Sequence, residues 1–243
     1  MTETVERTAG GAILYDRQVI SEISEDRFVA ANWLHSEPVQ GVLGSQGRGN
    51  TMFVGNVPRQ FVLRHYVRGG LIGKFIKDSY FWTGAEESRP FREWRMLAKM
   101  ADHGLRVPRP AAARYRRKGP FYTADLITVR VPGVQALSTC LHEGAKSEQF
   151  WLDLGKSIHE FHSYGVFHAD MNAYNLQIDS SGRLWMLDFD RGRLLAPGPW
   201  KQKTLSRLHR SLQKLKGLNP ALHYDQTCWE HLLEGYFNAS KSA

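Results

Sequence analysis

The sequence predicts an α+β chain with two lobes, a small antiparallel-sheet N-lobe at residues 1–130 and a mainly helical C-lobe at residues 131–243. Short apolar runs bounded by turn residues fill the N-lobe, as at residues 61–66, and such runs are typical of strands. In the C-lobe apolar residues recur every three or four positions, as at residues 148–162, which is the period of a helix. The pattern changes near residues 128–133, where we place the boundary between the two lobes of one domain.

The composition restricts the class of protein. With 42% hydrophobic and 12% aromatic residues, the chain has enough apolar surface to form a folded core, which excludes an intrinsically disordered protein. Cys140 and Cys228 lie far apart, so the sequence indicates neither a disulfide framework nor a zinc site and favours a reducing, cytosolic setting. The acidic start of the chain and the lack of any run near ~20 apolar residues predict no signal peptide and no membrane span.

Local patterns predict the N-lobe strands in order. Residues 11–15 are expected to form a strand after a polar lead, and residues 28–34 a short helix. The apolar runs around Phe53 and Phe61 predict two antiparallel strands joined by a turn at residues 55–59.

One longer helix is predicted in the N-lobe. It begins after Ser88, which we expect to cap it, has Pro90 in its first turn, and ends near Ala101 before Gly104. Residues 107–114 are then expected to be an extended connection.

The C-lobe is predicted to contain three amphipathic helices, at residues 148–162, 200–216 and 227–237. The first one leads directly into the segment that carries the chemistry. His159 and His162 on it lack a third ligand, so we interpret them as ordinary helix histidines rather than metal ligands.

The centre of the predicted site is His168-x-Asp170, with Asn175 five residues after the aspartate and Asp188 at the end of a later apolar run. This is the pattern of a phosphoryl-transfer site of the kinase type. In that pattern Asp170 is the catalytic base that accepts the proton of the acceptor hydroxyl. His168 orients the loop, and Asn175 and Asp188 are the predicted ligands of Mg²⁺, which prefers oxygen.

The strands around this motif explain its spacing. Residues 176–178 and 184–187 read as two short strands joined by a turn at residues 179–182, so Asn175 and Asp188 are expected at the same end. Together with the strand-rich N-lobe, this predicts a two-lobed protein-kinase-like fold.

A glycine cluster in the N-lobe is a candidate nucleotide-binding element. It contains Gly44, Gly47 and Gly49, with Arg48 among them, and glycines let backbone amides approach phosphate oxygens closely. Such a cluster also marks a flexible turn, and it lacks the Walker pattern. Its position well before the His-x-Asp motif favours the phosphate interpretation.

Arg64 and Glu93 form a second candidate. Arg64 ends the apolar run where a kinase lobe places a lysine that holds the α- and β-phosphates and pairs with a helical glutamate. Arginine also binds phosphates, in a bidentate manner. Glu93, on the predicted helix, is its candidate partner. The alternatives are an exposed strand arginine and a solvated helix glutamate.

The charge distribution indicates an anionic partner. The formal net charge is +8, and the segment from Arg191 to Tyr224 contains eight Lys or Arg residues and no Asp or Glu. Such a field favours nucleic acid, anionic lipid or a phosphorylated substrate, and the alternative is a solvated basic face. No nucleic acid is expected, because the chain has no base-stacking motif. No protein partner is predicted.

At these residues the chain resembles the bacterial lipopolysaccharide-core sugar kinases, and among them those that act on 3-deoxy-D-manno-octulosonic acid (Kdo). The resemblance covers roughly residues 40 to 215. The segments that carry it are Gly47-Arg-Gly-Asn-Thr51, Val62-Leu-Arg-His-Tyr-Val-Arg-Gly-Gly70, Ser88-Arg-Pro-Phe-Arg-Glu-Trp94, Val107-Pro-Arg-Pro110, Ala124-Asp-Leu-Ile-Thr128, His168-Ala-Asp-Met-Asn-Ala-Tyr-Asn175 and Leu187-Asp-Phe-Asp190.

The resemblance implies an ATP-dependent, Mg²⁺-requiring kinase that phosphorylates the 4-hydroxyl of a Kdo residue on a lipid A precursor. It also implies a peripheral protein at the cytoplasmic face of the bacterial inner membrane, in contact with its anionic surface. The basic run at residues 200–216 is then expected near the phosphates of the glycolipid or of the membrane. Asp190 and Arg64 depart from the protein-kinase pattern, and the short segment after Asp188 has no room for a long activation loop, which favours a non-peptide acceptor.

Two other functions stay open from the sequence. The first is a related kinase for a heptose or another small-molecule acceptor, because the sequence does not define the acceptor pocket. The second is a pseudokinase that binds nucleotide without transferring phosphate. Asp170, Asn175 and Asp188 argue against the pseudokinase, whereas Arg64 in place of lysine argues for it.

Overall fold

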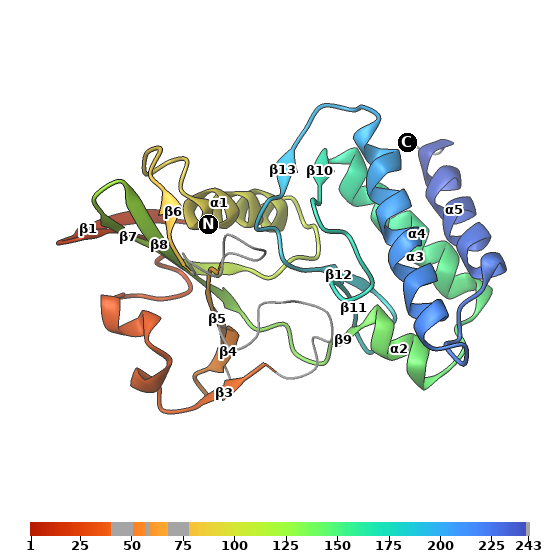
Figure 1. Cartoon of the computed structure of the whole chain (residues 1–243), viewed down its shortest axis with the longest axis horizontal. Coiled ribbons are helices and arrows are strands. Elements are labelled where there is room, and N and C mark those ends of the chain that lie inside the picture. Colours follow the sequence, from red (N-terminus) through yellow and green to blue (C-terminus); the bar gives the residue numbers. More distant parts are fainter. Residues whose placement is uncertain (40–50, 57–58, 68–77, 242–243) are drawn as a thin grey trace. The chain divides into compact units, whose positions relative to one another are not determined.

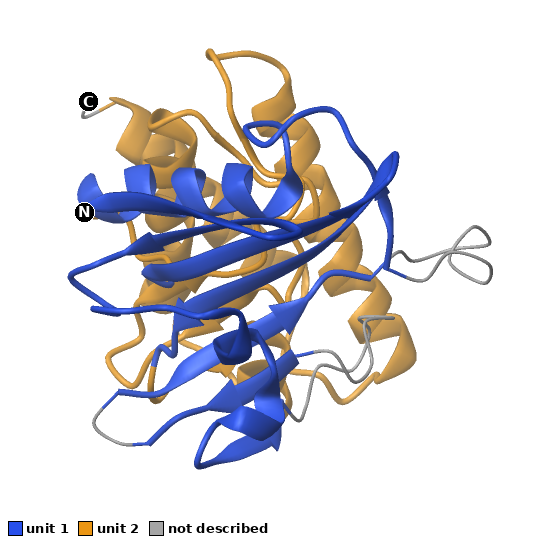
Figure 2. Ribbon diagram, turned by 90° about the vertical axis from the view of Figure 1, so that its left-hand side faces the viewer, with its two compact units in different colours: residues 1–103, 108–131 blue, residues 104–107, 132–243 orange. Residues whose placement is uncertain are grey.

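The computed structural model describes residues 1–39, 51–56, 59–67 and 78–241 (Figure 1). The chain divides into two compact units, which Figure 2 colours separately. Unit 1 contains Met1–His103 and Pro108–Val131, and unit 2 contains Gly104–Val107 and Pro132–Ala243. The short segment Gly104–Val107 belongs to unit 2, in which the Arg106 carbonyl accepts the amide of Met186 over 3.0 Å.

Unit 1 is built on an antiparallel sheet with the order β1-β2-β7-β8-β5-β4-β3, and β6 pairs with β8. The strands are β1 (Glu3–Thr8), β2 (Gly11–Asp16), β3 (Ser36–Pro38), β4 (Thr51–Val54), β5 (Phe61–His65), β6 (Tyr80–Phe81), β7 (Pro110–Lys118) and β8 (Phe121–Val129). The strand β5 lies between β4 and β8, so side chains near its end are held on both sides by pairing.

The helix α1 (Arg89–Asp102) packs against β7 and β8, where Phe91 contacts Tyr115 with ring centroids 5.2 Å apart. A second apolar cluster includes Ile13, Phe61 and Phe28. Phe28 joins this cluster from a 3-10 turn. Consecutive residues of β2 are buried, so side chains on both faces of this part of the sheet are covered.

Unit 2 is mainly helical, with two small sheets of the orders β12-β11-β9 and β10-β13. Its helices are α2 (Leu137–Glu143), α3 (Glu148–Ser163), α4 (Trp200–Leu218) and α5 (Gln226–Lys241). Its strands are β9 (Gln135–Ala136), β10 (Val166–Phe167), β11 (Leu176–Ile178), β12 (Leu184–Met186) and β13 (Arg193–Leu194). Within the described chain, no helix is both long and apolar enough to cross a membrane.

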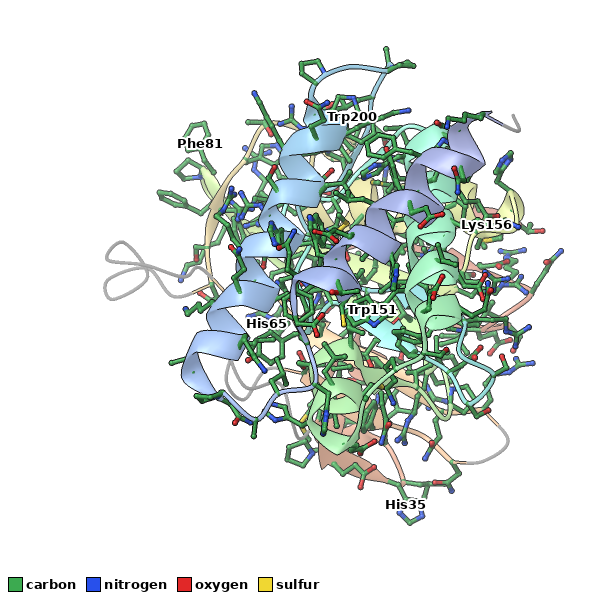
Figure 3. All side chains as sticks on the ribbon, turned by 90° about the vertical axis from the view of Figure 1, so that its right-hand side faces the viewer. His35, His65, Phe81, Trp151, Lys156 and Trp200 are labelled. Carbon is green, nitrogen blue, oxygen red and sulfur yellow. The ribbon has the colours of Figure 1, made fainter. Side chains whose placement is uncertain are left out.

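Two tryptophans anchor the helices of unit 2. Trp151 of α3 and Trp200 at the start of α4 are both buried (Figure 3). Trp200 packs against His162, with ring centroids 5.2 Å apart. His162 is itself buried and bonded to Tyr236 and Thr204, and burial lowers its pKa to about 3, so it is a neutral core histidine. The interpretation of His162 as an ordinary helix residue is confirmed.

The α+β class, with an antiparallel sheet followed by a mainly helical part, is confirmed, and so are most of the predicted elements. The segment expected to be a short helix at residues 28–34 instead contains two 3-10 turns, Glu25–Phe28 and Ala30–Asn32. They are separated because β-branched Val29 is extended, with φ −117° and ψ 113°.

Three further predictions were wrong or incomplete. The polar lead before residue 11 is strand β1, which alternates exposed and half-buried residues and pairs with β2. The connection at residues 107–114 becomes strand β7 at Pro110. Ser88 precedes α1 as expected but does not cap it, because its hydroxyl donates to the Ala85 carbonyl over 2.6 Å.

Candidate active site

The loop with the proposed base is anchored at Gly165. This glycine follows α3 with φ +88°, a conformation that residues with a Cβ rarely adopt. Its carbonyl accepts the amide of Leu195 over 2.8 Å, and an added Cβ would meet the Leu195 carbonyl oxygen at 2.6 Å. Glycine therefore lets the chain turn out of α3 and enter β10 close to the β13 segment.

The buried side chain of His168 holds the loop that carries Asp170. Burial lowers the pKa of this histidine, so the ring is neutral. Nδ1 accepts the amide of Asp170 over 3.1 Å, and therefore the proton is on Nε2, which donates to the Leu187 carbonyl over 2.8 Å. The ring thus links the backbone of Asp170 to the residue before Asp188. This geometry fits the orienting role predicted for His168.

Asp170 lies exposed at the tip of the loop, with 57% of its side chain accessible. Its carbonyl accepts the side-chain amides of Asn172 and Asn175, over 3.0 and 2.8 Å. Asn172 in turn accepts the amides of Tyr174 and Asn175 through its side-chain oxygen. The backbone is therefore held on several sides while the carboxylate of Asp170 faces solvent, where a substrate hydroxyl can reach it.

Asn175 and Asp188 are delivered to the same end of a hairpin. The strands β11 and β12 pair with Leu176 opposite Met186, and the Leu187 amide donates to the Asn175 carbonyl over 2.9 Å. This confirms the predicted hairpin geometry. Asp188 has φ +63°, so the chain bends sharply directly after β12. Its backbone conformation is of the strained kind that is often found at functional sites.

The two side chains fit a hard cation. The Asn175 amide nitrogen is committed to the Asp170 carbonyl, which leaves the amide oxygen as the available ligand atom. Asp188 is exposed and contributes carboxylate oxygens. One amide oxygen and one carboxylate are donors of the kind Mg²⁺ takes together with substrate phosphates.

A basic residue that the sequence did not single out lies beside the proposed base, Asp170. Arg207 on α4 places Nη1 3.6 Å from Oδ1 of Asp170, and both side chains are about half exposed, at 49% and 57%. The sequence marked Arg207 only as one member of a long basic run. No local sequence pattern distinguishes Arg207 from the other cations of this run as the one that contacts the loop of Asp170.

The predicted partners Arg64 and Glu93 are paired in unit 1. Nη2 of Arg64 on β5 lies 2.5 Å from Oε2 of Glu93 on α1, and Glu93 is almost completely buried. Tyr66 completes the cluster: its hydroxyl accepts from Arg64 over 3.0 Å and donates to Glu93 over 2.6 Å. The pairing is confirmed, and the solvated-glutamate alternative is wrong. Nucleotide binding by either residue stays a prediction.

The remaining residue of the Arg-His-Tyr motif serves another pair. His65 contacts Asp125 over 2.7 Å, and this hydrogen bond raises the pKa of His65. Asp125 is buried on β8 and also forms an ion pair with the buried Arg114 over 2.9 Å. Through these two contacts Asp125 links β8 to His65 of β5 and to Arg114 of β7. This explains why an aspartate lies inside an apolar strand.

The predicted phosphate-binding cluster of Gly44, Gly47, Arg48 and Gly49 lies outside the described residues.

The exposed Asp170 on its loop, with Asn175 and Asp188 at one end of the neighbouring hairpin, is an arrangement typical of phosphotransferases of the protein-kinase-like class that act on a hydroxyl group. The comparisons with known proteins place this chain among such enzymes. The model of the lipopolysaccharide kinase (Kdo/WaaP) family matches residues 34–236, and the chain belongs to this family. The sequence resemblance to these kinases is thereby confirmed.

Individual relatives agree with the family assignment. A 3-deoxy-D-manno-octulosonic acid kinase of Photobacterium profundum is 38% identical over 92% of this chain and 94% of its own length. A protein of the same name from Xylella fastidiosa is 40% identical over 85% of this chain and 82% of its own. Among solved structures, one of WbdD is 15% identical, with a TM-score of 0.49, and the match covers 86% of this chain and 46% of that one.

Proposed function

We propose that this protein transfers phosphate from ATP to a hydroxyl group of Kdo during lipopolysaccharide biosynthesis. The acceptor group we propose is the 4-hydroxyl of a Kdo residue on a lipid A precursor. The observation that carries the proposal is the exposed carboxylate of Asp170, held by His168 and Asn175, in a chain whose relatives are named as Kdo kinases. In this reaction Asp170 orients the acceptor hydroxyl and takes its proton.

The other residues have separate roles in this proposal. Asn175 and Asp188 would hold Mg²⁺, which when bound neutralises charge on the phosphates of ATP. His168, neutral and buried, keeps Asp170 and Asp188 in register by bonding to the backbone on both sides. Arg64, oriented by Glu93 and Tyr66, would contact the nucleotide phosphates as the kinase lysine does.

The direct experiment supplies the purified chain with ATP, Mg²⁺ and a Kdo-bearing lipid A precursor. We expect one phosphate to be added, seen by mass spectrometry, and NMR of the product to locate it at the 4-hydroxyl. Parallel reactions contain a heptose-bearing core acceptor or no acceptor. Transfer to the heptose acceptor alone would support the related kinase, and nucleotide binding without any transfer would support the pseudokinase.

Replacing Arg64 tests the proposed nucleotide contact. We expect Arg64→Ala to lower kcat/KM for ATP by roughly 10- to 100-fold, because a charged hydrogen bond to phosphate is worth about 1.5–3 kcal/mol. Arg64→Lys should retain more activity, since it keeps the charge but loses the planar donor pair. The measurement is the initial rate as a function of ATP at saturating acceptor. An Arg64→Ala protein that folds and keeps the wild-type kcat/KM for ATP would remove Arg64 from the nucleotide site.

Peripheral attachment to an anionic membrane surface is also proposed. In unit 1 the exposed Phe81 and Phe121 pack edge to face, 6.3 Å apart, and the exposed cations Arg116, Arg117 and Lys118 precede Phe121 on the same hairpin. Exposed aromatic rings beside cations are the composition that binds the interface of anionic bilayers. The inner membrane, at its cytoplasmic face, is the location we propose.

Vesicle binding tests this attachment. We expect the protein to sediment with vesicles that contain anionic lipid and much less with zwitterionic ones. Replacing Phe81 and Phe121 together with Ser should reduce binding by more than about tenfold, because each apolar side chain that enters the bilayer interface contributes up to roughly 1.5–3 kcal/mol. Leu34→Ser is the matched control, since Leu34 is 90% exposed elsewhere in unit 1. Equal binding of the double variant and the wild type would show that these rings do not touch lipid.

A further inference from the structure

The helix α4 carries a stripe of four exposed cations, Lys203, Arg207, Arg210 and Lys214, which we call the cationic stripe. The spacing of four, three and four residues places all four on one side of the helix. The opposite side is apolar and buried, through Leu205, Leu208, Leu212 and Leu215. These leucines form the apolar face of the amphipathic helix predicted at residues 200–216, and their burial turns the cationic stripe outward.

Two contacts fix the cationic stripe against the catalytic loop. Arg207 lies 3.6 Å from the carboxylate of Asp170. One turn further along α4, the hydroxyl of Ser211 accepts the amide of Ala173 over 3.2 Å. Because Ala173 lies between Asp170 and Asn175, the loop is attached to α4 at two successive turns. The register between the stripe and the proposed base is therefore set by the fold of unit 2.

The cationic stripe has little charge of its own to neutralise it. No Asp or Glu occurs between Arg191 and Tyr224. Among the residues that the structure describes, Asp170 is the one carboxylate within ion-pair distance of any of the four cations. Four exposed cations that begin at the base and continue along one helix face are suited to bind an extended anion rather than a single ion.

We propose that Arg207 binds the carboxylate of the acceptor sugar, and that Arg210, Lys203 and Lys214 bind further anionic groups of the glycolipid. This deepens the proposed function and rests on it. The relatives are named for an octulosonic acid, whose carboxyl group is ionised at neutral pH. One sugar then carries both the carboxylate and the acceptor hydroxyl.

The geometry explains how one arginine can serve base and substrate. A guanidinium has five N–H donors, and the contact with Asp170 uses one edge at a distance of 3.6 Å. The remaining donors suit a second carboxylate in a bidentate manner. With the sugar held by its carboxylate beside Asp170, the hydroxyl is presented to the base without a search over orientations. Arg207 would in this way select acidic sugars over neutral ones of similar shape.

The test compares Arg207→Gln with the wild type on two acceptors, a native Kdo glycolipid and the same compound with its carboxylate reduced to an alcohol. For the wild type we expect the reduced acceptor to have a KM roughly 10- to 100-fold higher, the loss of one charge-assisted pair. Arg207→Gln should raise the KM of the native acceptor by a similar factor and lose the discrimination between the two. The KM for ATP should stay within about twofold.

Control variants separate binding from positioning and from net charge. Lys156→Gln removes one exposed cation from α3 (Figure 3), away from the stripe, and should change neither KM. Arg210→Gln should weaken binding of an acceptor that carries the lipid A phosphates but not of a Kdo acceptor without them. Circular dichroism and thermal midpoints confirm that each variant is folded.

Three outcomes overturn the inference while the proposed function stands. The first is Arg207→Gln retaining the wild-type preference for the carboxylate. The second is a lower kcat with both acceptors and an unchanged preference, which would make Arg207 only a positioning residue for Asp170. The third is a wild type that phosphorylates Kdo but does not distinguish the two acceptors. A wild type that phosphorylates no Kdo acceptor overturns the proposed function itself, and the inference with it.

Discussion

Replacing Asp170 with Asn is expected to lower kcat by about 10²- to 10⁴-fold, the usual contribution of a positioned general base. Asparagine has nearly the same size, and the backbone contacts of the loop do not involve the carboxylate. The carbonyl of residue 170 still accepts the amides of Asn172 and Asn175, and its amide still bonds to His168. The loss should therefore appear in turnover rather than in folding or in ATP affinity.

The measurement is the single-turnover rate with ATP and the Kdo-bearing acceptor, with nucleotide affinity determined separately. Asp153→Asn is the matched control, because Asp153 is an exposed aspartate on α3 whose carboxylate accepts a hydrogen bond from the side chain of Gln149. It should keep the wild-type rate. Near-wild-type turnover by Asp170→Asn would mean that another group accepts the proton, and the mechanism proposed for this site would fail.

Replacing Gly155 with Ala is expected to destabilise unit 2 by about 1–3 kcal/mol or more. Gly155 on α3 and Gly235 on α5 form a close crossing of the two helices. A Cβ at Gly155 would meet the Leu232 carbonyl oxygen at 1.9 Å, and one at Gly235 would meet the Leu152 carbonyl oxygen at 2.0 Å. Both obstacles are backbone atoms, so the helices must move apart to admit a methyl group.

The intrinsic preference of helices acts in the opposite direction, since alanine is better than glycine by up to about 1 kcal/mol. Gly217→Ala isolates that preference, because Gly217 lies exposed on α4 with no atom within 4 Å of an added Cβ. We expect Gly217→Ala to be neutral or stabilising and Gly155→Ala to lower the urea midpoint and the thermal midpoint. Unchanged midpoints for Gly155→Ala would show that α3 and α5 are not in backbone contact.

The same substitution is expected to affect activity indirectly. The helix α3 ends just before Gly165, which starts the loop that carries His168 and Asp170. A displacement of α3 therefore reaches the base through the chain itself. In Gly155→Ala the loss of activity should follow the loss of folded protein as temperature rises, unlike the loss in Asp170→Asn.

Local signals in the sequence were sufficient for much of unit 2. The amphipathic helix predicted at residues 148–162, the apolar face of α4, and the hairpin that delivers Asn175 and Asp188 were all predicted. Each depends on residues within a few turns or one hairpin of one another, where periodicity and turn chemistry act directly. The His-x-Asp spacing is local in the same sense.

Contacts between distant residues had weaker signals or none. The pairing of Arg64 with Glu93 was predicted only by analogy with kinase lobes, and Tyr66, which bonds to both, was not predicted. The interior pair of Arg114 and Asp125 was also missed, because a strand pattern shows where a side chain alternates but not which neighbour lies across the sheet.

The sequence by itself determined the class of chemistry, because a base, an amide and a carboxylate at these spacings on one loop and one hairpin are typical of phosphoryl transfer. It also showed that residues 191–224 are basic without acids. Only the tertiary structure decided which of those cations lies beside Asp170. Helix α4 packs through its leucines, and this turns Arg207 toward Asp170, 37 positions earlier in the chain. Such a contact depends on how a helix docks, and no local pattern encodes it.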